Sequence, residues 1–351
     1  MGGSLAPTAV TDGRLGIGNR LIVTIRGLPF GGWWVYVLVG VATAAWLTVV
    51  TWLTHVAPVG HVDMSRLAPA AYGAYALALI QYLDGVASHA IDDFEPALGP
   101  GAGSVADWHD ELTTLPARPA NIAVFAGLAF GALVLAGTPP AVYQLYSHDL
   151  PTTLLLTGWV VLVGFAGMAL LLYHTWHQLR VVAAIHAAAS RIDPFRPGPL
   201  FAFSRLTART GLGYVAAMYY TLTINAELAS SEPALLIVEV LLAIAAFACF
   251  VLPLLGIHRR LDDAKAELVD QANVAMKKAS AELYAHVDRG EWSEMAGVDD
   301  SVSSLGRIRD VVAQLPTWPW TAGLFRGFLT AVLLPIVIWI ITRVLGNVLT
   351  I

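Results

Sequence analysis

The stretch PALLIVEVLLAIAAFACFVLPLLGIHRRLDDAKAELVDQANVAMKKASAELYAHVDRG, residues 233–290, decides the fold of this chain. Its first half is apolar enough to lie in lipid, whereas its second half is charged and rich in alanine. No turn signal separates the two halves. We therefore predict one helix, kinked at Pro253 and Gly256, that leaves a bilayer and continues into water.

The composition of the whole chain agrees with a membrane location. Of its 351 residues, 57% are hydrophobic and 13% are charged, and the mean hydropathy is +0.65. Soluble domains average about 25% charged residues. The single cysteine, Cys249, falls inside an apolar stretch, so no disulfide is expected within the chain. The first thirty residues show no pattern of a removable signal peptide.

Seven apolar stretches predict an all-α integral membrane protein with seven transmembrane helices. The expected spans cover residues 33–55, 70–91, 121–146, 153–179, 200–230, 233–255 and 321–348. Polar side chains between Gln81 and His89 interrupt the second span, and the Gly- and Pro-containing segment from Glu95 to Ala120 is predicted to be a loop. The expected divisions are a cytosolic tail (1–31), a six-helix membrane region (32–257), a cytosolic amphipathic helical hairpin (258–317) and the seventh helix (318–351).

The predicted hairpin has the character of a short coiled coil. Small or apolar residues recur every three or four positions at Leu261, Ala264, Leu268, Ala272, Ala275, Ala279, Leu283 and Val287, and again at Val302, Leu305, Ile308, Val312 and Leu315. Each series forms one stripe on a helix, so the two helices should pack against each other antiparallel. The alanine-rich stripe would also allow a second copy of the chain to approach closely.

The distribution of cationic residues predicts the orientation in the plasma membrane. With seven spans and a cytosolic N-terminus, only Arg66 and Arg343 of the 20 Lys and Arg residues lie outside. This bias satisfies the positive-inside rule and places the C-terminus outside. It also requires the span at 70–91, because without it the tail and the Arg180–Arg209 cluster would lie on opposite sides.

An acidic stripe is the sharpest candidate site. On a helix, four polar residues that run from the middle of the second span to just beyond its inner end fall within about 80° of arc. An ionised carboxylate at membrane depth is costly unless it is paired or hydrated. Together with one carboxylate of the sixth span, the candidates for an ion path or proton relay are Asp84, Ser88, Asp92, Glu95 and Glu239. The alternative is a helix end held by structural hydrogen bonds.

A second candidate is a metal site at His174 and His177, which share one face of the fourth span. They are expected at about the depth of Asp84–Asp92, where histidine and carboxylate together could bind a divalent metal. Two histidines alone do not complete a ligand set, and interfacial packing is the alternative. No other cofactor is expected.

The basic run IDPFRPGPLFAFSRLTARTG, residues 192–211, is a candidate surface for lipid headgroups. Three arginines of the run and the one that directly precedes it could contact anionic lipids or the acidic loop at 92–111: Arg191, Arg196, Arg205 and Arg209. This run and PLLGIHRRLDDAK, residues 253–265, resemble segments of uncharacterised prokaryotic multi-pass membrane proteins. The resemblance implies a membrane protein and brings no activity with it.

Other motifs limit the function. Gly127 and Gly131 form a small-residue pattern that could pair two copies of the chain. The sequence has no P-loop, HExxH or GxSxG motif, so no enzyme class is indicated. Its last span has no lysine, which a seven-helix retinal protein needs, and no feature suggests nucleic-acid binding. We expect passage of an ion or small solute along the acidic face. A membrane-anchored sensor or scaffold acting through the hairpin is the alternative, and a membrane-embedded metal enzyme is the third hypothesis.

Overall fold

The computed structural model describes residues 16–55, 57–62, 64–137, 154–224, 233–290 and 295–349. Within these residues all regular elements are helices, and Leu98 and Ala189 form an isolated antiparallel bridge. Four helical stretches are long and apolar enough to cross a membrane: Pro29–Leu53, Ala117–Gly137, Leu156–Ala188 and Val240–Arg289. A shorter apolar helix covers Ala322–Ile338. The described part of the chain is therefore all-helical with four candidate spans, and the count of seven stays a prediction.

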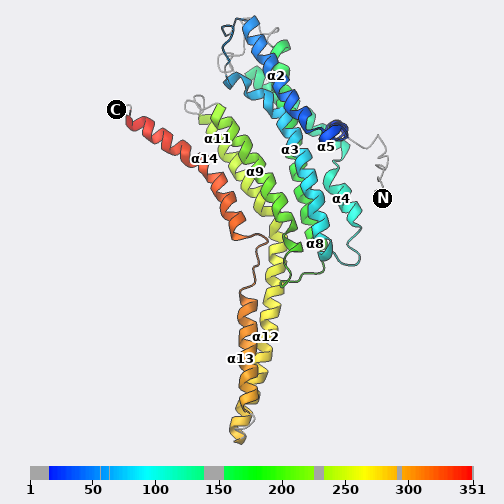
Figure 1. Cartoon of the computed structure of the whole chain (residues 1–351), viewed down its shortest axis with the longest axis vertical. Helices are drawn as coiled ribbons and strands as arrows, with labels where there is room; N and C mark the ends of the chain where they lie inside the picture. Colours follow the sequence, from blue (N-terminus) through cyan, green and yellow to red (C-terminus); the bar gives the residue numbers. More distant parts are fainter. Residues whose placement is uncertain are drawn as a thin grey trace.

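Two long helices, α3 (Met64–Phe94) and α8 (Trp159–Ala188), form the centre of the bundle (Figure 1). A π-helical turn, Leu154–Gly158, precedes α8. Helix α3 packs against α2 (Trp33–Leu53), α8 and α9 (Ala202–Ile224), and Ile80, Leu83 and Ile91 on it have no exposed surface. A helix enclosed by protein need not be as apolar as one that faces lipid. This explains why α3 and α9, at the predicted second and fifth spans, are not among the four candidates.

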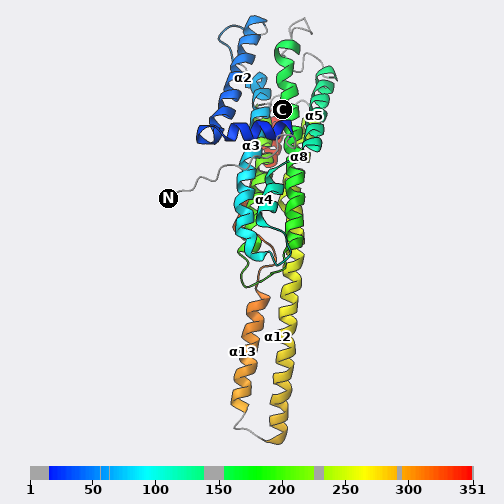
Figure 2. The same ribbon diagram turned by 90° about the vertical axis from the view of Figure 1, so that its right-hand side faces the viewer.

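The segment predicted as a surface tail contains a docked helix, α1 (Ile17–Arg26), which lies across the bundle at a steep angle to α3 (Figure 2). It buries Gly18, Asn19 and Ile22. The turn η1 (Pro29–Gly32) then redirects the chain into α2. Gly32 has a φ of 70°, and a Cβ atom there would lie 2.0 Å from the Ile25 carbonyl oxygen, so this turn requires glycine.

The predicted loop between Glu95 and Ala120 is wrong at its centre, where α4 (Val105–Thr113) forms. The Ser104 side chain accepts a hydrogen bond from the Asp107 amide and caps this helix. A 3₁₀ turn, η2 (Glu95–Ala97), precedes α4, and α5 (Ala117–Gly137) follows it. The sequence signal was present as a serine followed three residues later by an aspartate, but the helix is short and bordered by glycine and proline.

Two glycines of α5 pack against α8 of the same chain. A Cβ atom at Gly127 would lie 2.5 Å from the Phe165 carbonyl oxygen of α8, and one at Gly131 would lie 3.2 Å from the Phe165 side chain. The face that we expected to join two copies is therefore covered by α8. Small residues let these two helices approach closely, as in membrane helix pairs generally.

The organising helix is broken where Pro253 predicts a kink. Helix α11 (Pro233–Val251) ends in the 3₁₀ turn η5 (Leu252–Leu254), after which α12 (Leu255–Arg289) runs out of the bundle beside α13 (Met295–Ala313) (Figure 1). Gly256 lies inside α12, so only the proline breaks the helix. The last helix, α14 (Ala322–Leu349), returns to the bundle and packs against α9.

The stripes of the extension match the packing with two exceptions. Leu261 and Ala272 of α12 and Val312 of α13 are buried, and Leu261 belongs to the core of the bundle. Val287 and Ile308 are 37% and 53% exposed, although we predicted both in the stripes. Near the end of α12 the neighbouring His286 is buried in place of Val287.

Candidate functional site

Three side chains from three helices meet inside the bundle. Asp84 on α3 accepts a hydrogen bond from Nε2 of His174 on α8 at 2.8 Å, through its Oδ1 atom. Its Oδ2 atom accepts one from Nη2 of Arg26, the last residue of α1, at 2.9 Å. Asp84 and His174 are 2% and 1% exposed. Both carboxylate oxygens are thus engaged by cationic or polar partners.

The Asp84 carboxylate determines which nitrogen of the His174 ring carries a hydrogen. An ionised carboxylate only accepts hydrogen bonds, so Nε2 of His174 carries a hydrogen. Arg26 compensates the charge of Asp84, and its side chain is 43% exposed, so its other donors reach the surroundings. The cluster has a buried end at His174 and a more accessible end at Arg26.

Two further polar residues support the cluster from the side of α2. Gln81, one turn before Asp84 on α3, accepts a hydrogen bond from the Tyr36 hydroxyl at 2.7 Å. Its amide nitrogen donates to the Gly31 carbonyl in η1 at 2.8 Å. The turn between α1 and α2 is thereby attached to α3 beside Asp84, which holds Arg26 in reach of the carboxylate.

The C-terminal end of α4 covers α8 one turn below His174. The last carbonyls of a helix have no partner within it, and side chains of α8 supply partners here. Nε2 of His177 contacts the Glu111 carbonyl at 3.1 Å, and Nε2 of Gln178 donates to the Leu112 carbonyl at 3.3 Å. Helix α4, which we did not predict, therefore closes the site toward the extension.

Hydroxyl groups continue from the cluster toward the opposite end of the bundle. Three contacts lie at the packed faces of α3, α8 and α9: the Tyr214 hydroxyl to that of Thr175 at 3.0 Å, the Tyr75 hydroxyl to the Gly213 carbonyl at 2.6 Å, and the Tyr72 hydroxyl to that of Thr221 at 3.0 Å. We call this series the hydroxyl seam. It begins at the depth of His174, because Thr175 is the next residue on α8.

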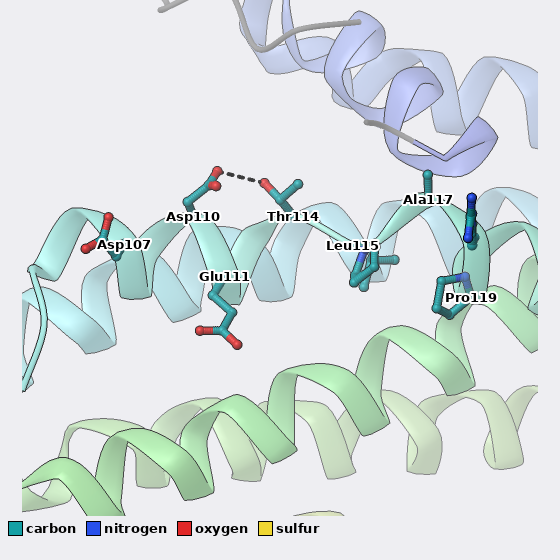
Figure 3. A pocket seen from close by; sticks show the side chains of 9 residues that line it. Asp107, Asp110, Glu111, Thr114, Leu115, Ala117 and Pro119 are labelled. Atoms are coloured by element: carbon teal, nitrogen blue, oxygen red, sulfur yellow. Dashed lines mark hydrogen bonds between the residues drawn. The ribbon is translucent and has the colours of Figure 1, made fainter. Parts of the chain in front are cut away.

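A surface cleft of about 670 Å³ lies between α4 and the start of α5 (Figure 3). Asp107, Asp110 and Glu111 line one part of it, and Arg118 lies in another. Asp110 accepts a hydrogen bond from the Thr114 hydroxyl, whereas the Glu111 side chain points toward α8 (Figure 3). An acidic cleft thus lies beside His177 at the surface.

The other members of the predicted acidic stripe do not join the cluster. The Ser88 hydroxyl donates to the backbone carbonyl of Asp84 at 2.9 Å, and Asp92 and Glu95 are exposed. Glu239 lies on α11, but its side chain is outside the described residues. The stripe therefore divides into one buried carboxylate and exposed ones nearer the extension.

The candidate metal ligands have other partners. His174 is directed at Asp84 and His177 at the Glu111 carbonyl. In the part of the chain that the structure describes, no group of three or more His, Cys, Asp or Glu side chains could hold a metal ion. The ligand set that a membrane-embedded metal enzyme needs is therefore incomplete there.

The four candidate lipid-binding arginines lie on the surface. Arg191, Arg196, Arg205 and Arg209 are exposed, and within the described residues none of them forms an ion pair with the 92–111 segment. Arg209 lies over the Tyr82 ring at 5.7 Å. The contact between the two segments is made by the backbone instead, through the Arg191 amide and the Ala97 carbonyl at 3.2 Å.

A second set of contacts ties the extension to α8. Nη1 of Arg260 on α12 donates to the His186 carbonyl at 2.9 Å and also to the Ala189 carbonyl, both at the end of α8. The His186 ring is buried and contacts the Pro253 carbonyl in η5 through Nδ1 at 3.2 Å. The helix that carries His174 therefore holds the base of α12.

Arg260→Ala is expected to loosen this attachment, because two carbonyls at the end of α8 lose their donor. Spin labels at the exposed positions Asp93 and Glu267, in a Cys249→Ala background, should give a broader distance distribution than in the parent protein. Arg259→Ala removes the same charge from an exposed position and should leave the distribution unchanged. Equal distributions in all three proteins would show that Arg260 does not hold α12.

Four residues of these contacts have no pattern in the sequence that predicts their place in the site: Arg26, Tyr36, Gln81 and Arg260. Arg26 ends a helix with one apolar face. That face indicates that the helix packs against the bundle, but it does not indicate which side chain Arg26 contacts.

We compared the chain with models of protein families, with curated proteins and with solved structures, and none of the three comparisons found a match. The function is therefore argued from the geometry of the site.

Proposed function

We propose that this protein is a multi-pass membrane protein that passes an ion or small solute across the bilayer between α3, α8 and α9. The observation that carries the proposal is the buried Asp84, held between Arg26 and His174. Ionisable groups inside membrane bundles are costly, and they commonly mark substrate paths and proton relays. The hydroxyl seam supplies further polar groups along the packed faces of the same helices.

The proposed route has two ends with different chemistry. At the end nearer the extension, the acidic cleft at Asp107, Asp110 and Glu111 would attract cations. At the other end the seam reaches Tyr72 and Thr221. With seven spans, a cytosolic N-terminus and an outer C-terminus, the cleft and the helical hairpin of α12 and α13 would face the cytosol.

Asp84→Asn is expected to abolish transport, because the amide keeps the size of the side chain and removes the charge of the site. The purified full-length protein would be reconstituted in liposomes, and uptake of sodium, potassium, protons and small uncharged solutes would be measured. Asp92→Asn is the matched control, since Asp92 lies on the same helix and is exposed. Equal flux in both variants, or no flux above protein-free liposomes for the parent protein, would refute the proposal.

The attachment of α12 to α8 favours one alternative, a membrane-anchored sensor or scaffold. A rearrangement around His174 would be transmitted along α8 to Arg260 and so to the hairpin. In that case the hairpin would bind a partner protein or a second copy, and the exposed arginines from Arg191 to Arg209 would contact anionic lipids. This alternative predicts that Asp84→Asn changes the hairpin distances without any measurable flux.

A further inference from the structure

His174 and Gln178 lie one turn apart on the same face of α8, and each has a polar atom without a hydrogen-bond partner among the described residues. These atoms are Nδ1 of the histidine and Oε1 of the glutamine. The two residues are 1% and 0% exposed. Leaving a polar atom unpaired at such depth is costly. Two of them on one face therefore indicate a position that a bound species can fill.

The surrounding hydrogen bonds show that both atoms are acceptors when His174 is neutral. Nε2 of His174 carries the ring hydrogen, because it faces the Asp84 carboxylate. Nδ1 is then a lone pair. The amide nitrogen of Gln178 donates to the Leu112 carbonyl, which directs Oε1 as the acceptor. Each of these two acceptors is therefore without a donor in the part of the chain that the structure describes.

We infer that the species moved along the proposed route is the proton and that it binds at Nδ1 of His174. This inference rests on the proposed function. Uptake forms one N–H bond at Nδ1 while one O–H bond breaks in the donor, a hydronium ion from one side of the membrane, and the neutral ring becomes a cation. Oε1 of Gln178, one turn away on the same face of α8, is an acceptor for that N–H and has no other partner within the described ranges. Release breaks the N–H bond, forms one O–H bond on a water molecule at the other side and restores the lone pair.

The close packing of α3 and α8 favours the proton over larger species. A Cβ atom at Gly167 would lie 3.1 Å from the Gly73 Cα atom, so the helix backbones are nearly in contact above the cluster. Both oxygens of Asp84 are occupied by Arg26 and His174. A hydrated ion or a solute would require the helices to separate. A proton needs only the rearrangement of hydrogen bonds along the hydroxyl seam.

The groups around His174 set opposing electrostatic effects. They are Asp84 on α3, Arg26 on α1, Tyr36 on α2, Glu111 on α4, His177 and Arg180 on α8, and Tyr214 on α9. The two carboxylates stabilise a cationic ring, and the cations oppose it. Arg26 is the partly exposed cation, so it can turn away from Asp84 when His174 gains charge.

Proton flux through liposomes tests the substrate. The full-length protein is reconstituted with a pH-sensitive dye inside, and a potassium gradient with valinomycin drives protons inward. His174→Gln should lower the rate to that of protein-free liposomes, since the amide can still donate to Asp84 but cannot take up a proton at neutral pH. The matched control is His89→Gln, an exposed histidine of α3, which should keep the parent rate.

Nitrogen NMR of protein labelled with ¹⁵N-histidine tests binding independently of flux and of the folding of variants. The resonance lost in His174→Gln should change from the neutral Nε2–H form to the doubly protonated ring as the pH is lowered. If His174→Gln does not fold, selective contacts to the Asp84 carboxyl carbon assign the resonance in the parent protein. A ring that stays neutral at every pH at which the protein remains folded would overturn the inference.

The two assays separate failure of the inference from failure of the route. Flux of sodium, potassium or a solute that depends on Asp84, without any flux of protons, would overturn the inference and leave the route. A His174 ring that titrates in a protein that moves nothing would overturn the route, and with it the proton as its substrate. Proton flux that survives His174→Gln would overturn the assignment of the binding atom.

Discussion

Asp84→Ala is expected to lower the free energy of unfolding by about 3 kcal/mol, the lower end of the range for removing one partner of a buried ion pair. His174 would keep a buried N–H without an acceptor, and Arg26 would lose its counter-charge. The loss stays at the lower end because Arg26 is 43% exposed and can turn toward water. Unfolding of the purified protein in detergent, followed by circular dichroism, measures the change.

Asp92→Ala is the matched control for this measurement, because Asp92 is exposed on the same helix. It should change the stability by no more than about 0.5 kcal/mol. The double variant Arg26→Ala/Asp84→Ala should lose less than the sum of the two single variants, since the two side chains contact each other. Strict additivity would mean that the ion pair contributes nothing to the fold.

Gly127→Ala is expected to destabilise the protein by about 1–3 kcal/mol, as overpacking of a close contact does. The new methyl group would lie 2.5 Å from the Phe165 carbonyl oxygen and 2.7 Å from the Ala166 Cα atom. Both are backbone atoms of α8, so no side-chain rotation can relieve the clash. Helices α5 and α8 would have to separate, and the same unfolding measurement would detect the loss.

Gly40→Ala provides the contrast to Gly127→Ala. Gly40 lies within α2, and a Cβ atom there meets nothing within 4 Å. Alanine should therefore stabilise the helix by about 0.5–1 kcal/mol, because glycine loses more backbone freedom on folding. Similar effects at both positions would mean that the contact between α5 and α8 is not tight.

Part of the site follows from the order of helices along the chain. In the predicted layout the second and fourth spans run in the same direction, which brings Asp84 and His174 to a similar depth, and the structure places their side chains 2.8 Å apart. The partner Arg26 does not follow from that order. Its position depends on the burial of Ile22, on the left-handed turn at Gly32 and on the hydrogen bond of Gln81 to Gly31. None of these contacts has a periodic signature.

The sequence by itself determined the helical class, the apolar stretches, the break at Pro253 and most of the stripe along α12, since each depends on residues close together in the chain. Only the tertiary structure decided which polar groups meet. Asp84 is 58 residues from Arg26 and 90 from His174, and α4 covers Gln178 from a segment without strong periodicity. Local propensity decides where each helix forms. Close packing at residues such as Gly127 and Gly167 decides which face each helix turns toward its neighbours.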